Sequence, residues 1–195
     1  MFKNILAFLI SASCFSCTSQ NLLTSDVPNI RGKLLNGDSS NLTVIAKDKV
    51  TLVNVWGIFC SPCMKELPIL QKVYEKYKNR KDFAFISVAM DSESELLSFL
   101  NQKDTSNSYK KMFRYSTLDS FALPTLACLP HGYTSLYGGY AIVQDSSECK
   151  MLLGKINSIG IPTTLIFNRS GKLIFKQVGS VDDTILLTNK IDSLL

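Results

Sequence analysis

A chain of 195 residues has the length of one domain, with room for an insertion. Its hydrophobic content of 46% is that of a globular protein with a core, which argues against a disordered chain. The net charge of +5 is modest and the basic residues are scattered, so the dense basic patch of a nucleic-acid-binding protein is missing from the sequence. We therefore expect no nucleic-acid partner.

The first 17 residues have the pattern of an export signal. A lysine near the start is followed by an apolar run from Ile5 to Ile10, and then by small residues and cysteines. The apolar run is too short for a comfortable membrane span. A cysteine after such a run resembles the bacterial lipoprotein signal, in which that cysteine is lipidated. Cys17 fits this role better than Cys14 because it leaves the longer apolar region, and ordinary secretion with full removal is the alternative.

This pattern sets the expected organisation and location of the chain. We expect a signal segment over 1–17, a linker over 18–26 and one domain over 27–195, with an insertion at about 105–139. The mature protein would lie on the periplasmic side of a bacterial membrane, held there by a lipid anchor. Disulfides persist in such a compartment.

Within the domain, strand-like and helix-like segments alternate. Asn36-Gly37 predicts a hairpin turn within 31–44, and Arg169-Ser170-Gly171 predicts another within 161–179. The remaining predicted strands are 49–57, 82–90 and 140–145, and the predicted helices are 61–78, 92–102, 146–158 and 182–195. This order predicts an α/β sandwich whose sheet has a mostly parallel centre and an antiparallel edge.

Cys60 and Cys63 lie where the predicted strand 49–57 gives way to a helix, at the end of a strand where open α/β folds place their chemistry. A c-type haem site is excluded because Met64 stands where a histidine is needed. A zinc site lacks two further ligands, and a structural disulfide rarely closes so short a loop. A redox dithiol remains, because a helix N-terminus stabilises the thiolate of Cys60. We expect no metal and no cofactor.

The segment TLVNVWGIFCSPCMKELP resembles the active-site segment of the TlpA/ResA-like thioredoxin-fold family of extracytoplasmic thiol–disulfide oxidoreductases. The family pattern is Val-Asn-Phe-Trp-Ala-x-Trp-Cys-x-Pro-Cys-x-x-Glu-x-Pro. The residues that match it are Asn54, Trp56, Cys60, Pro62, Cys63, Glu66 and Pro68. The resemblance covers about 27–104 and 140–195. It implies a thioredoxin-like three-layer sandwich with an N-terminal β-hairpin and an insertion before the third strand–helix unit.

The resemblance also implies roles for particular residues. Cys60 would be the nucleophile and Cys63 the resolving cysteine, and Glu66 would move protons and tune the thiols. A surface glutamate is the alternative for Glu66. The expected substrate groove comprises Trp56, Phe59, Pro62, Ile161 and a cis Pro162. The chain departs from the pattern at Phe59, where Trp is usual, and at Gly57, where Ala is usual.

Cys128 and Cys149 flank the end of the expected insertion. In an oxidising compartment we expect a structural disulfide between them, and separate buried thiols or a redox relay with Cys60 are the alternatives. His131, close to Cys128 in sequence, is expected to be a loop residue rather than a ligand.

The expected function is reduction of protein disulfides, with client protein thiols and disulfides as partners and a membrane thiol-relay protein as electron donor. A thiol peroxidase of the peroxiredoxin class is one alternative, although Gly57 stands where its motif needs threonine before Cys60. A non-enzymatic binding lipoprotein of the same fold is the other.

Overall fold

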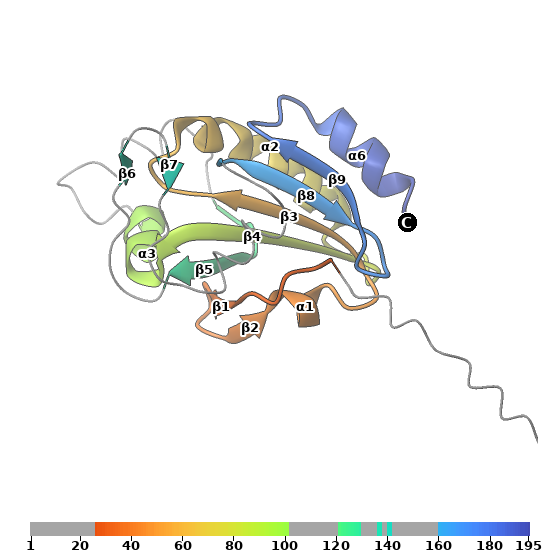
Figure 1. Ribbon diagram of the computed structural model, residues 1–195, viewed down its shortest axis with the longest axis horizontal. Coiled ribbons are helices and arrows are strands. Elements are labelled where there is room, and N and C mark those ends of the chain that lie inside the picture. The colour runs from red at the N-terminus through yellow and green to blue at the C-terminus, as the bar shows by residue number, and fades with distance from the viewer. Residues whose placement is uncertain (1–25, 102–120, 130–135, 138–139, 142–159) are drawn as a thin grey trace, which may run out of the picture.

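A mixed seven-stranded sheet forms the centre of the molecule, in the order β2-β1-β5-β4-β3-β8-β9. The computed structural model (Figure 1) describes residues 26–101, 121–129, 136–137, 140–141 and 160–195. The strands of this sheet are β1 (Arg31–Leu34), β2 (Ser39–Asn41), β3 (Val50–Trp56), β4 (Phe83–Ser92), β5 (Thr125–Leu129), β8 (Thr163–Phe167) and β9 (Leu173–Val178). A separate pair is formed by β6 (Leu136–Tyr137) and β7 (Tyr140–Ala141).

The parallel centre of the sheet is built from its most apolar strands. β3 and β4 are buried at every position and run parallel in a register that pairs Val50 with Phe83 and Trp56 with Ala89. Strands covered on both faces are apolar at most positions, which explains why neither shows polar alternation. The carboxyl ends of β3 and β4 therefore lie side by side.

Two hairpins supply the antiparallel edges, as the sequence predicts. β1 pairs with β2 around Gly37, whose φ of +89° is a conformation that glycine adopts without strain. β8 pairs with β9 around Gly171, whose φ is +77°. β8 also pairs antiparallel with β3 and so joins its hairpin to the centre of the sheet.

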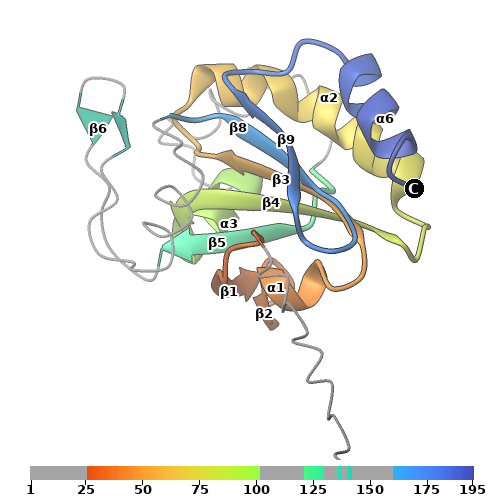
Figure 2. The ribbon, with the colours of Figure 1, turned by 45° about the vertical axis from the view of Figure 1, so that its right-hand side comes forward.

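Helices and the residues just before β1 cover the two faces of the sheet (Figure 2). One face packs against α2 (Ser61–Tyr77), α3 (Glu93–Asn101) and α6 (Thr184–Asp192), whose buried side chains share one apolar cluster. The other face packs against α1 (Leu42–Ile45) and the residues before β1, including Val27 and Ile30. The three layers predicted from the sequence are confirmed.

The predicted insertion at 105–139 needs a correction. Residues 125–129 form β5, which lies in the main sheet between β1 and β4 and runs parallel to β4. The next strand of the sheet after β4 along the chain is therefore β5 rather than 140–145. This run is short, lacks alternation and stands between Pro124 and Pro130. The sequence pattern therefore did not indicate a strand here, because its strand partners are distant in sequence.

Several predictions fall on residues outside the described ranges. They concern the signal segment with Cys14 and Cys17, the helix at 146–158 with Cys149, and His131. Within the described ranges, no helix is long and apolar enough to cross a membrane.

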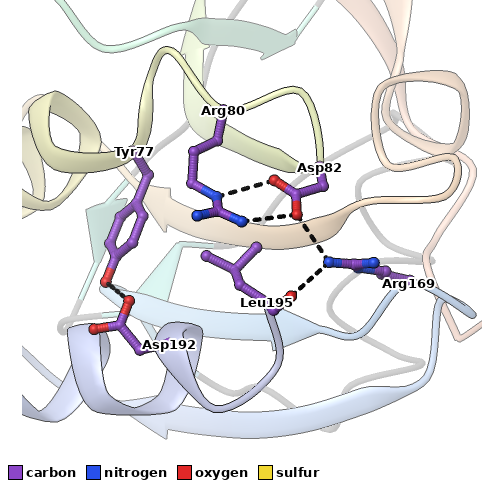
Figure 3. A network of polar contacts seen from close by, with 6 residues as sticks. All are labelled: Tyr77, Arg80, Asp82, Arg169, Asp192 and Leu195. Carbon is purple, nitrogen blue, oxygen red and sulfur yellow. Dashed lines mark hydrogen bonds and ion pairs between the residues drawn. The ribbon is translucent and has the colours of Figure 1, made fainter.

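A polar network joins three segments at the end of the sheet opposite the carboxyl ends of β3 and β4 (Figure 3). Asp82, just before β4, accepts hydrogen bonds from Arg80 at 2.9 Å and from Arg169 at 2.8 Å. Arg169 also donates to the main-chain oxygen of Leu195 at 2.7 Å. The network therefore ties the β8–β9 turn and the end of the described chain to the start of β4.

Candidate active site

Cys60 and Cys63 are joined by a disulfide at the N-terminus of α2, with their Cα atoms 5.2 Å apart. Cys60 is the N-cap residue, and its sulfur accepts a hydrogen bond from the Cys63 amide at 3.2 Å. Cys60 is partly exposed, whereas Cys63 is fully buried. A helix N-terminus favours negative charge, so this geometry suits an accessible thiolate at Cys60 and a protected second sulfur.

A tight turn leads from β3 into the dithiol. The Cys60 amide donates to the Gly57 carbonyl at 3.1 Å, which closes the turn over 57–60. Phe59 in this turn is 47% exposed, and Pro62 in the first turn of α2 is also exposed. An apolar surface beside the reactive sulfur suits contact with a peptide.

The segment before β8 reaches the same turn. The peptide bond between Ile161 and Pro162 is cis, as the family resemblance implies. A Cβ atom built on Gly57 would lie 3.2 Å from the Cδ1 atom of Ile161, so Ile161 packs directly over the turn. Phe59, Pro62 and Ile161 are thus the expected groove residues with some exposed surface.

Trp56 does not lie on that surface. Its side chain is fully buried, packs against Phe99 and Phe121, and donates from its indole nitrogen to Ser87 Oγ. It supports the turn from beneath rather than lining the groove as expected, because its position in β3 directs it into the core.

Glu66 lies one turn after Cys63 and is fully buried. Its Oε1 atom accepts from the Asn54 side-chain amide at 2.8 Å, and its Oε2 atom accepts from the Val181 main-chain amide at 2.9 Å. Burial raises the pKa of Glu66 to about 7, against the lowering effect of these two hydrogen bonds and with a further rise from the charge of Asp182. The group can therefore exchange a proton near neutral pH, and it is not the surface glutamate that was the alternative.

Asn54 connects this carboxyl to the sheet. Its amide nitrogen also donates to Thr164 Oγ1 at 3.1 Å, while its Oδ1 atom is buried without a hydrogen-bond partner among the described residues. If Glu66 is protonated, rotation of the amide would let Asn54 Oδ1 accept that proton's hydrogen bond. Asn54 can thus serve both charge states of Glu66.

A second buried carboxyl, Asp91, was missed by the sequence reasoning. It is 7% exposed, and its Oδ2 atom accepts from the Ile58 amide in the turn before Cys60 at 2.9 Å. Burial raises its pKa to about 7, the Ile58 hydrogen bond lowers it, and the charge of Glu95 raises it further. The signal in the sequence was an acid directly after a buried strand, at the sheet edge that carries the dithiol.

Known proteins show where this architecture recurs. A thiol-disulfide oxidoreductase ResA of Bacillus cereus is 27% identical over 99 residues, which are 51% of this chain and 57% of that protein. ResA of Bacillus subtilis is 22% identical over 164 residues, which are 83% of this chain and 70% of that protein. The chain thus spans little more than half the length of the first relative. These matches confirm the resemblance inferred from the dithiol segment.

Solved structures agree on the fold. The thioredoxin domain of a thiol-disulfide oxidoreductase from Bacteroides vulgatus matches with a TM-score of 0.55 at 23% identity, over 86% of this chain and 97% of that one. A thiol:disulfide interchange protein of the thioredoxin family from Chlorobium tepidum matches with a TM-score of 0.56 at 18% identity, over 86% and 94%. The predicted thioredoxin-like fold is confirmed. The family model described as Redoxin matches residues 23–195, and the chain therefore belongs to the Redoxin family.

Proposed function

We propose that this chain is an exported thiol–disulfide oxidoreductase that reduces protein disulfides through Cys60 and Cys63. The observation that carries the proposal is the pairing of a partly exposed sulfur at the N-cap of α2 with a fully buried sulfur one turn on. The names of the ResA relatives support the same chemistry.

The reaction takes two steps. The Cys60 thiolate attacks a client disulfide, so one client sulfur leaves as a thiolate that takes up a proton, and a mixed disulfide forms. Cys63 then loses its proton and attacks the Cys60 sulfur, which releases the second client thiol and forms the Cys60–Cys63 disulfide. Two electrons pass from the protein to the client, and a membrane thiol-relay donor would return them.

Glu66 is proposed as the group that accepts the Cys63 proton. It lies one helical turn from Cys63, and its pKa of about 7 suits proton transfer at neutral pH. The hydrogen bonds from Asn54 and the Val181 amide favour the ionised form, which accepts a proton, against the larger opposite effect of burial.

The groove proposed for the client is formed by the exposed Phe59 and Pro62 and by Ile161 with the cis Pro162. The client would be an extended peptide segment that contacts the main chain of Ile161, as the family resemblance implies. Trp56 would contribute by keeping the turn in place from the core.

Export and anchoring belong to the same proposal. The apolar run at 5–10 and the following cysteines support a lipid anchor on Cys17 or Cys14, which would keep the domain at the outer side of the membrane. Labelled palmitate should be incorporated into the parent and into Cys14→Ser but lost in Cys17→Ser. Label retained in Cys17→Ser and lost in Cys14→Ser would move the anchor to Cys14.

Insulin reduction tests the activity. The parent with dithiothreitol should precipitate insulin faster than dithiothreitol alone, Cys60→Ser should not, and Cys63→Ser should accumulate a mixed disulfide with insulin on Cys60. Peroxide consumption that requires Cys60, without insulin reduction, would favour a thiol peroxidase. Neither activity in correctly folded protein would favour a binding protein.

A further inference from the structure

Asp91 occupies a special place at the carboxyl end of β4. The regular pairing of β3 with β4 ends at Trp56 and Ala89, and Asp91 follows two residues later, beside the turn that leaves β3. On its other side β4 pairs with β5, and the register there shifts between Ala89 and Ser92. Such irregularities redirect side chains, and here the affected stretch carries an acid toward the dithiol turn.

The contacts of Asp91 are with the turn that presents Cys60. Its Oδ2 atom accepts the Ile58 amide at 2.9 Å and lies 3.6 Å from the position of a Cβ atom on Gly57. The same Cβ position is 3.2 Å from Ile161 Cδ1. The carboxylate therefore lies beneath the point where the turn over 57–60 meets the segment of the cis proline.

Among the described residues, the charge that acts on Asp91 has the same sign as its own carboxylate. It belongs to Glu95 on α3, and the turn contributes the Ile58 amide. Glu95 is itself held by the main-chain amide of Ser92 at 3.0 Å and by its hydroxyl at 2.7 Å. A buried carboxyl beside a charge of the same sign is costly, and a neutral side chain could satisfy the Ile58 amide at lower cost.

Asp91 and Glu66 are separate groups. Glu66 is bound by Asn54 and Val181, whereas Asp91 is bound by Ile58, and they share no hydrogen-bond partner among the described residues. Glu66 reaches the dithiol through α2, and Asp91 reaches it through the preceding turn. The two can therefore be separated by mutation.

We propose that Asp91 is a positioning residue of the dithiol, whose carboxylate holds the Ile58 amide and thereby the turn that aims the Cys60 sulfur. An ionised acceptor binds an amide more strongly than a neutral one, so the turn is held most firmly when Asp91 is charged. The rate of attack by Cys60 then depends on the charge of Asp91 as well as on the ionisation of the Cys60 thiol. The proposal rests on the proposed function of Cys60 as the nucleophile.

The variant Asp91→Asn tests this because it copies the neutral acid in shape and can still accept the Ile58 amide. The measurement is the single-turnover reduction of a neutral disulfide, bis(2-hydroxyethyl) disulfide, by pre-reduced protein between pH 5.5 and 8.5. The rate of the variant divided by that of the parent should be near one at pH 5.5 and about one fifth at pH 8.5. The midpoint should lie near pH 7, where Asp91 titrates.

Glu95→Gln provides the matched control. Glutamine can keep the contacts to Ser92, but it removes the charge that raises the pKa of Asp91. The rate of Asp91→Asn/Glu95→Gln divided by that of Glu95→Gln should have the same limiting values at low and high pH. Its midpoint should lie at a lower pH. Circular dichroism at each pH confirms that every variant is folded.

Three results would overturn the proposal. A ratio of one at every pH means that Asp91 has no role in the reaction. A constant ratio below one means that it only stabilises the fold, and a ratio above one at high pH means that its charge hinders Cys60. A failure of the proposed function is a separate result. In that case the parent does not reduce insulin, but the rates of Asp91→Asn and the parent with the small disulfide still show the predicted ratio.

Discussion

Glu66 shows how burial gives a single residue its chemistry. The same side chain on the surface of α2 would be an ordinary carboxylate, but loss of solvation raises its pKa to about 7 despite two hydrogen bonds to its oxygens. Asn54 stands beneath it in β3 and does not titrate, so Glu66 is the proton acceptor that the described surroundings of Cys63 offer.

Replacing Glu66 by Gln keeps its size and removes its titration. We expect disulfide exchange to slow by about 10²-fold above pH 7, where the parent carboxylate accepts the Cys63 proton. The rate of the parent falls as pH drops through 7 because Glu66 becomes protonated, and the variant should keep only the smaller change with pH that is assigned to Asp91. Stopped-flow reduction of a model disulfide between pH 5 and 9 measures both effects.

Asp182→Asn is the control for that experiment. The charge of Asp182 raises the pKa of Glu66, so its removal should move the Glu66 inflection to lower pH and leave the limiting rate unchanged. A Glu66→Gln variant that matches the parent across the whole range would make Glu66 a structural residue of α2.

At the level of elements, sheet packing decides which residues are replaceable. Gly32 in β1 faces β5 so closely that a Cβ atom would lie 2.7 Å from the Ala127 carbonyl oxygen. Gly32→Ala must move main chain, and we expect the free energy of unfolding to fall by about 1–3 kcal/mol. Hydrogen exchange of β1 should accelerate, because β1 joins the sheet through β5.

Gly160→Ala is the matched variant for stability, because among the described residues its Cβ would meet the Val178 side chain at an ordinary 3.7 Å. It should leave the free energy of unfolding near that of the parent. Equal unfolding free energies for Gly32→Ala and the parent would mean that the β1–β5 junction yields without cost.

The difference between local and distant contacts explains which parts of the fold and of the candidate site could be predicted from the sequence. Cys60 caps α2, and Cys63 and Glu66 lie in its first turns, so local periodicity placed these three residues correctly at the start of one helix. β5 and Asp91 were missed because their roles depend on partners that are distant in the sequence. Nothing local in the sequence indicates that the Val181 amide closes over Glu66, 115 residues away.

For the molecule as a whole, Cys128 and Cys149 test whether the protein matures in an oxidising compartment. Cys128 lies in β5, and Cys149 lies outside the described residues. We expect non-reducing peptide mapping of exported protein to find them joined, and the pair's removal to lower stability by about 3 kcal/mol. Insulin reduction should persist without the pair. Unchanged stability with a large loss of turnover would instead favour a redox relay with Cys60.

The dependence of global stability on pH follows from the two buried acids together. Glu66 and Asp91 both have folded-state pKa values of about 7, above their unfolded values near 4. Between pH 4 and 7 the folded state therefore binds more protons than the unfolded state, so the free energy of unfolding must fall as pH rises. Each group contributes on the order of 4 kcal/mol to this fall, which is complete above pH 7.

Urea unfolding at pH 5 and pH 8 measures this fall directly. The parent should be markedly less stable at pH 8, and the double variant Glu66→Gln/Asp91→Asn should lose most of the difference because neither replacement ionises. Asp82 and Asp192, whose pKa values are lowered by their Arg80, Tyr77 and Lys76 partners, act in the opposite direction and only below about pH 4. A parent stability that is flat or rises from pH 5 to 8 would show that the two acids are solvated in the folded protein. The protein would then lack the buried proton acceptor that its proposed chemistry requires.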